Sequence, residues 1–136
     1  MKKGDFKMNG IEYQNLAMRT NDGKATNRLL NLTLSDTTEN GIGEDTGTIL
    51  NACLGLSGEV GEFNDMIKKW IFHENDLDEE HLKKELGDIM WYIAMMCHAF
   101  RWDLDEIMEM NIDKLKARYP EGFDTDRANN RKNGDV

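Results

Sequence analysis

Four acidic residues, arranged in two pairs, are the part of this sequence best suited to chemistry. Glu59 and Glu62 are three residues apart, and so are Glu85 and Asp88. Residues at i and i+3 share one helix face, about 5–6 Å apart. Facing carboxylates repel one another unless protonation or a cation neutralises them. Mg²⁺ prefers oxygen ligands and joins carboxylates to substrate phosphates. The spacing therefore predicts a magnesium site, against the simpler interpretation of a solvated acidic surface.

Glycines alternate with the first acid pair. Gly55, Gly58 and Gly61 lie in the segment LGLSGEVGEFND (54–65), and Gly87 lies within the second pair. A glycine inside a helix costs about 1 kcal/mol relative to alanine. Small residues let helix backbones approach closely, so we interpret the glycines as bringing the acids within metal-bridging distance and leaving room for a ligand. On this interpretation, Gly58→Leu disturbs helix packing as well as activity.

The elements that would position the acids are helices. Apolar residues recur at helical spacing across 48–72 and 78–100. The short turn 73–77 between them predicts that these two helices are antiparallel neighbours. The sequence predicts two further helices, one over 9–20 and one over 103–119, the latter ended by a proline.

The remaining segments are polar. Residues 21–47 are predicted to form a loop that contains an apolar patch at 29–34, and this patch fits a helical turn or a short strand. Residues 124–136 are predicted to form a polar tail. Residues 89–100 are apolar on nearly every side, and four short helices cannot surround such a helix. We therefore expect one all-α domain over residues 1–136, an antiparallel helical bundle of about four helices completed by oligomerisation.

The composition excludes some partners and predicts a location. The net charge of −9 and the pI of about 4.8 argue against binding a nucleic-acid polymer, which favours a basic surface. The longest apolar run, 89–97, is too short to span a membrane, and the N-terminus lacks a signal-peptide pattern. The sequence has two cysteines, Cys53 and Cys97, which lack metal-ligand spacing, and nine methionines. This composition predicts a reducing, cytoplasmic setting.

Three segments resemble a known family. GLSGEVGEFNDMIKKWIF (55–72), LKKELGDIMWYIAMM (82–96) and MNIDKLKARYPEGF (110–123) are similar to the MazG-type nucleotide pyrophosphohydrolases of the all-α NTP pyrophosphatase superfamily. The family signature is E-x-x-E, a spacer and E-x-x-D, and here the spacer is 63–84. The resemblance extends over about 9–131 and is weakest in the loop. It implies Mg²⁺-dependent hydrolysis of a nucleoside triphosphate (NTP or dNTP) to the monophosphate and pyrophosphate by a homo-oligomer, a dimer or a dimer of dimers.

The resemblance also implies roles for the acids. The metal ligands would be Glu59, Glu62, Glu85 and Asp88. Bound Mg²⁺ would clamp the triphosphate and lower the pKa of a water that attacks the α-phosphate. The catalytic base that takes the proton of this water would be Glu59 or Glu62.

Five residues are candidates for substrate binding. Lys69 lies ten residues after the first acid and roughly on its helix face, and Tyr92 lies one turn after the last acid, where it can pack under a base. Asn111, Lys114 and Arg118 share one helix face at i, i+3 and i+7, and they match a family segment that contacts phosphates. A polar surface face is the competing interpretation of these three.

The histidines, one tryptophan and one further acid are assigned no catalytic role. A di-iron carboxylate bundle needs a histidine three residues after a glutamate, which neither helix has. We therefore interpret His73 as a turn residue, His81 as a surface residue and His98 as a packed residue. Trp70 is interpreted as a core residue in preference to a base-stacking one, and Asp65 as an outer metal ligand or a surface acid.

Two other functions fit the same sequence. Nine methionines suit an adaptable surface, so the chain could be a non-catalytic Met-rich helical oligomer that binds a partner protein. A phosphoribosyl-nucleotide pyrophosphohydrolase of histidine synthesis would share the acid pattern. Release of pyrophosphate from NTPs separates the enzymes from the binding module, and substrate profiling separates the two enzymes.

Overall fold

The computed structural model divides into two compact units, Met1–Gly43 and Glu44–Val136. It describes residues 8–35 of the first unit and residues 45–130 of the second. Six helices and no strand are found in these described residues. The predicted all-α class is therefore confirmed, although the number of helices exceeds the four expected.

The N-terminal unit contains α1 (Gly10–Met18) and α2 (Ala25–Ser35). A reciprocal capping box starts α1, because the Asn9 side chain accepts from the Glu12 amide at 2.9 Å and the Glu12 carboxylate accepts from the Asn9 amide at 3.0 Å. Helix α2 corrects the prediction of a loop over 21–47 at residues 25–35, and residues 36–44 of that loop lie outside the described residues. The apolar patch was too short to show helical periodicity, but it continues a helix that begins four residues before it.

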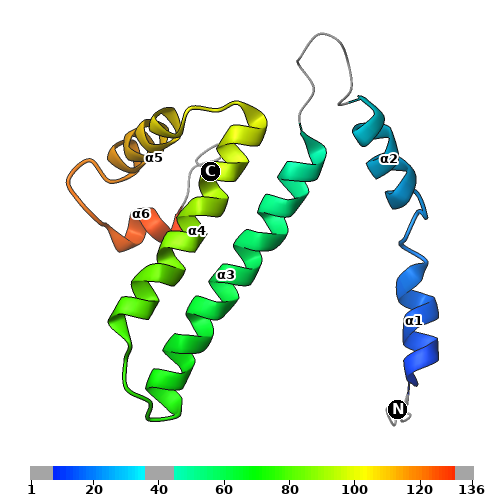
Figure 1. The fold of residues 1–136 in the computed structure, drawn as a ribbon, viewed down its shortest axis with the longest axis horizontal. Coiled ribbons are helices and arrows are strands. Elements are labelled where there is room, and N and C mark those ends of the chain that lie inside the picture. Colours follow the sequence, from blue (N-terminus) through cyan, green and yellow to red (C-terminus); the bar gives the residue numbers. More distant parts are fainter. Residues whose placement is uncertain (1–7, 36–44, 131–136) are drawn as a thin grey trace. The chain divides into compact units, whose positions relative to one another are not determined.

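The C-terminal unit is built on a pair of long helices, α3 (Thr46–Phe72) and α4 (Glu79–Phe100), which lie side by side and run antiparallel (Figure 1). Aspartates cap both N-termini: Asp45 accepts from the amide of Thr48 and Asp78 from that of His81, each at 3.0 Å. Helix α3 ends at Phe72, and the amide of its C-cap residue His73 donates to the Lys69 carbonyl. These bounds confirm the two central helices, their connecting turn and the predicted position of His73 in it.

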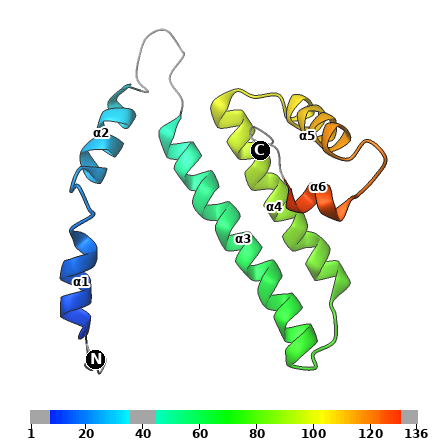
Figure 2. The same cartoon turned by 180° about the vertical axis from the view of Figure 1, so that it is seen from behind.

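Two shorter helices follow, α5 (Leu104–Arg118) and α6 (Thr125–Asn129), and both lie on the α4 side of the long pair (Figures 1 and 2). The side chain of Asp103 caps α5 as expected. Helix α6 falls within the predicted polar tail 124–136, of which residues 131–136 lie outside the described residues. Its cap is Asp124, which accepts from the amides of Asp126 and Arg127. A helix that begins at such a cap can form without an apolar stripe, so its sequence shows no helical periodicity.

Little apolar surface is buried within the single chain. The buried apolar residues in the described part are Ala52, Cys97 and Ala99, whereas Leu54 and Met90 are 67% and 62% exposed. The extensive helix contact is that of α3 with α4, so the single chain contains one packed helix pair, and completion of the bundle by oligomerisation stays a prediction. The helices of this pair leave apolar side chains uncovered on several sides.

Two apolar features differ in how they relate to the sequence-based expectations: the exposure of Trp70 and the length of the apolar helices. Trp70 is 45% exposed, so its interpretation as a core residue is wrong for the isolated chain. No helix in the described ranges combines the length and the apolar character needed to cross a bilayer.

Candidate metal centre

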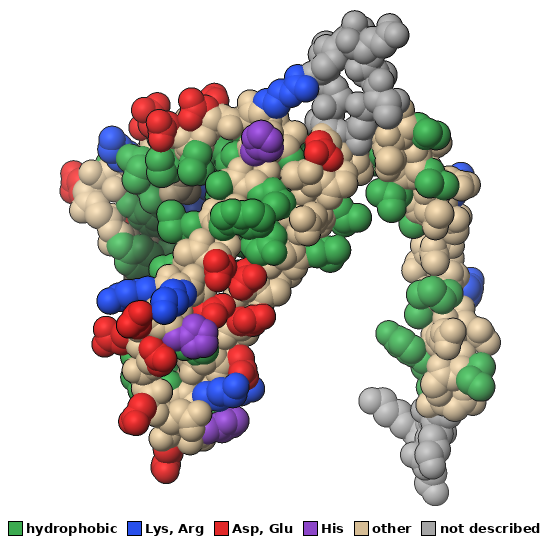
Figure 3. Space-filling model, viewed as in Figure 1, with side chains coloured by type: hydrophobic (Ala, Val, Ile, Leu, Met, Phe, Trp, Pro, Cys, Tyr) green, Lys and Arg blue, Asp and Glu red, His purple; other side chains and the backbone are tan. Residues whose placement is uncertain are grey.

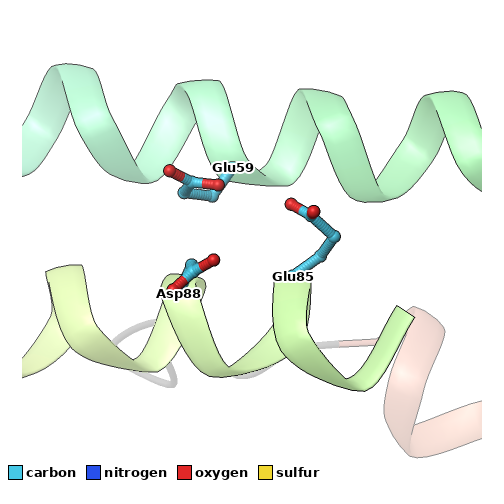
Figure 4. A group of neighbouring side chains, drawn as sticks. All are labelled: Glu59, Glu85 and Asp88. Atoms are coloured by element: carbon cyan, nitrogen blue, oxygen red, sulfur yellow. The ribbon is translucent and has the colours of Figure 1, made fainter. Parts of the chain in front are cut away.

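Three of the four predicted acids converge in the space between the two long helices. Glu59 projects from α3, while Glu85 and Asp88 project from α4 and point back toward it (Figure 4). Each offers a carboxylate oxygen, and these oxygens all lie within 4.8 Å of one another. Because the helices are antiparallel, the acids at the middle of each meet at one level, as the spacing predicted.

Glu62 lies beside this group rather than inside it. It lines a pocket of about 340 Å³ that also includes Glu85, a size within the usual range for ligand sites. The complete lining is Gly58, Gly61, Glu62, Asp65, Met66, Lys69, His81 and Glu85. On the face shown in Figure 3, acidic side chains gather over the half of the α3–α4 pair nearer the connecting turn.

The electrostatics of the group favour a cation. Desolvation raises the pKa of Glu59, and the negative charges of Glu62, Asp88 and Glu85 raise it further. Each effect disfavours the ionised carboxyl, so the group is unfavourable when fully charged. A divalent cation among these oxygens would offset the repulsion.

Glu85 is the acid most removed from water, with 7% of its surface exposed. Its Oε1 lies 2.8 Å from His81 Nε2. Its Oε2 is shielded from solvent and accepts no hydrogen bond from any residue in the described part of the chain. A buried carboxylate oxygen without a partner is costly, and buried charges normally pair with a cation or coordinate a metal. The donor set therefore fits a hard divalent cation such as Mg²⁺.

A cationic side chain lies at the edge of the same pocket. Lys69 Nζ lies 2.6 Å from Asp65 Oδ2, and Lys68 Nζ lies 2.5 Å from Asp65 Oδ1. The two lysines lower the pKa of Asp65 to about 2. Asp65 thus forms ion pairs with lysines, and this pairing holds Lys69 beside Glu62 and Glu85.

The four glycines do not share one role. A β-carbon on Gly55 would lie 2.1 Å from the Tyr92 ring, so close approach operates there. A β-carbon on Gly58, Gly61 or Gly87 would meet nothing within 4 Å. A β-carbon at Gly58 thus meets no neighbour, and the expectation that the larger side chain of Gly58→Leu disturbs packing stays a prediction. Gly58 and Gly61 instead leave open the pocket that they line.

The other predicted substrate residues lie elsewhere. Tyr92 is half-buried with its ring against Gly55. Asn111 and Lys114 line a second pocket of about 640 Å³ with Trp102, Glu106, Ile107 and Met110. Arg118, half-buried on the last turn of α5, accepts from the Arg127 side chain through its carbonyl. The structure thus brings Lys69 to the acids, whereas Asn111 and Lys114 line a separate pocket.

Sequence reasoning missed the role of one histidine. His81 is exposed, as interpreted, yet its ring contacts the most buried acid of the group. Its position four residues before Glu85, one helical turn away, was the available signal. His98, interpreted as packed, is exposed, which corrects that interpretation.

Comparison with known proteins gives two matches. The model of the MazG nucleotide pyrophosphohydrolase domain matches residues 48–123, which contain all four acids. The gene 37 protein of Mycobacterium phage L5 is 30% identical over 82 residues, covering 57% of this chain and 72% of that protein. No solved structure matches significantly.

Proposed function

Because the chain belongs to the MazG nucleotide pyrophosphohydrolase family, we propose that it hydrolyses a nucleoside triphosphate to the monophosphate and pyrophosphate with Mg²⁺. The proposed metal ligands are Glu59, Glu62, Glu85 and Asp88. Water attacks the α-phosphorus, the bond to the bridging oxygen breaks, and pyrophosphate leaves with that oxygen.

One observation carries this proposal: three carboxylates converge, and the most buried of them, Glu85, has a shielded oxygen that accepts no hydrogen bond within the described residues. A merely solvated acidic surface would leave such an oxygen in water. A site that holds a divalent cation accounts for both the convergence and the missing partner.

The chemistry divides between the cation and the chain. When bound, Mg²⁺ would polarise the α-phosphate and acidify the attacking water. Glu62 lies in the pocket outside the converging group, so it is the residue better placed to take the proton of that water, with Glu59 as the alternative. Lys69, held by Asp65 at 2.6 Å, supplies a positive charge for the phosphates beside the acids.

The remaining proposed substrate contacts come from the second pocket, from the last turn of α5 and from α4. Asn111 and Lys114 present an amide and an ammonium group next to the apolar side chains of Trp102, Ile107 and Met110. Such a mixture suits a ligand with a flat apolar part and an anionic part. Arg118 and Tyr92 complete the proposed set of substrate contacts.

We further propose that the working enzyme is a homo-oligomer, a dimer or a tetramer. Large apolar side chains of α4 remain exposed in the single chain, including Met90, Trp91 and Leu86 at 62%, 56% and 49%. Contiguous apolar surface of this kind marks interaction sites. A second copy would cover it and complete the bundle around α4.

The direct test is incubation of the purified chain with each NTP and dNTP and Mg²⁺, with measurement of pyrophosphate. We expect equimolar monophosphate and pyrophosphate from at least one nucleotide, and no release in EDTA. Release of orthophosphate instead would contradict attack at the α-phosphorus. A folded protein that releases neither product from any nucleotide would contradict the enzyme and favour a binding module.

A further inference from the structure

We infer that His81 is a positioning residue for the metal site, which it serves by holding the carboxylate of Glu85 in one orientation. This inference rests on the proposed metal centre. In this role His81 contacts Glu85, a metal-binding residue, and contacts neither the metal nor the substrate.

The geometry carries the inference. His81 Nε2 lies 2.8 Å from Glu85 Oε1, within ion-pair distance, so the imidazole pairs with that oxygen. The other oxygen, Oε2, is the shielded atom without a hydrogen-bond partner in the described residues. With Oε1 occupied by His81, Oε2 is the oxygen left for a cation shared with Glu59 and Asp88.

The backbone fixes this arrangement before any ligand arrives. His81 and Glu85 are one turn apart on α4, where side chains at i and i+4 meet on one face. Asp78 caps the same turn through the His81 amide at 3.0 Å, which anchors the backbone that carries the ring. Hydrogen bonds that orient metal-binding carboxylates typically contribute 10–100-fold in metal affinity or activity.

His81 is suited to positioning more than to ligation. The group of side chains whose donor atoms lie within 4.8 Å of one another contains Glu59, Glu85 and Asp88 and not His81. Its side chain is 56% exposed, whereas that of Glu85 is 9% exposed. The ring therefore reaches the solvent, whereas the carboxylate that it contacts is withdrawn from it.

The test uses Mn²⁺ as a spectroscopic substitute for Mg²⁺, with free Mn²⁺ measured by EPR on the full metal-stripped chain. We expect His81→Ala to weaken Mn²⁺ binding about 10–100-fold. We expect His81→Gln to restore most of that loss, because the glutamine amide can donate to Glu85 Oε1 but is a poor metal ligand. The exposed position and the high helix propensity of alanine should keep both variants folded, which circular dichroism will verify.

The matched control is His98→Ala. It removes the same side chain from an exposed position on the same helix, about 20 Å from Glu85 along the axis, and should bind Mn²⁺ as the unmodified chain does. A parallel activity titration should show a higher Mg²⁺ requirement for His81→Ala and a preserved rate at saturating Mg²⁺.

The outcomes separate the two levels of the proposal. If the unmodified chain binds Mn²⁺ and His81→Ala binds it equally well, the positioning role is wrong and the metal centre stands. If His81→Gln binds as weakly as His81→Ala, His81 acts as a ligand itself and the positioning role is again wrong. If the unmodified chain binds no Mn²⁺, the metal centre fails and the inference fails with it.

Discussion

The ring of Tyr92 on α4 occupies the space that a side chain on Gly55 of α3 would need. A β-carbon at Gly55 would lie 2.1 Å from Tyr92 Cε1 and 2.2 Å from Cζ, well inside van der Waals contact. Because these are ring atoms, the aromatic side chain would have to swing out or the helices would have to separate. Gly55 thus sets the approach of α3 and α4 near the acidic group.

Gly55→Ala and Gly58→Ala form a matched pair that tests this contact. Each substitution removes a helical glycine, which favours the helix by about 1 kcal/mol. Only Gly55→Ala adds the clash, which costs about 1–3 kcal/mol by analogy with overpacked cores. We expect Gly58→Ala to be the more stable variant by that difference, measured from urea unfolding midpoints at constant slope. Equal midpoints would show that Tyr92 moves aside without cost.

Glu62→Gln should abolish turnover while leaving the helices intact. The substitution removes one negative charge and little volume from the pocket shared with Glu85. We expect a loss of about 100-fold or more in the rate of pyrophosphate release, since even outer-sphere changes at metal sites cost up to that amount. Circular dichroism checks the fold, and Glu79→Gln, at the first turn of α4, is the control. Full activity of Glu62→Gln would mean that the catalytic site lies elsewhere.

Glu59→Gln should stabilise the metal-free protein at neutral pH. The pKa of Glu59 is raised above its ordinary value of 4.5, so the folded state holds this proton more tightly than the unfolded chain. The free energy of unfolding therefore falls as the pH rises from about 4.5 through the folded-state pKa. The glutamine variant escapes this loss.

The measurement for Glu59→Gln is urea unfolding in EDTA at pH 7 and at pH 4. The variant should have the higher free energy of unfolding at pH 7, and this difference should shrink at pH 4. Saturating Mg²⁺ should reverse the difference, because only the unmodified chain has the full set of metal ligands. Glu121→Gln, in the segment between α5 and α6, should show no such pattern. An advantage that is equal at both pH values would exclude the proposed repulsion.

Met90→Lys should dissociate the proposed oligomer. Met90 is 62% exposed on α4, and a lysine there would leave an uncompensated charge in an apolar interface. Light scattering should give the unmodified protein two or four times the chain mass of 15.7 kDa and the variant a mass near that of one chain. Asn64→Lys, which adds the same charge at an exposed polar position of α3, should keep the oligomer. A monomeric unmodified protein would contradict this proposal.

Much of the central architecture could be predicted because it is local. The apolar repeat of residues 48–72 and the cap at Asp78 are encoded within a few residues, and both match the structure. Helices α2 and α6 were missed because short helices show little periodicity: the apolar patch of α2 spans only residues 29–34, and α6 is a run of five mostly polar residues. Those helices do not carry the acids, so the misses left the predicted site unaffected.

The sequence by itself determined that two acid pairs would lie on two antiparallel helices, because helical spacing and a short turn are properties of the local chain. Only the tertiary structure decided how these groups divide. It placed Glu59, Glu85 and Asp88 together and Glu62 beside them, buried one oxygen of Glu85 and set His81 against the other. It also showed that Gly55 alone among the glycines at 55, 58, 61 and 87 faces a close neighbour. The reason is physical: burial, hydrogen bonding and steric contact depend on the rotation and separation of two helices, which no spacing along one chain specifies.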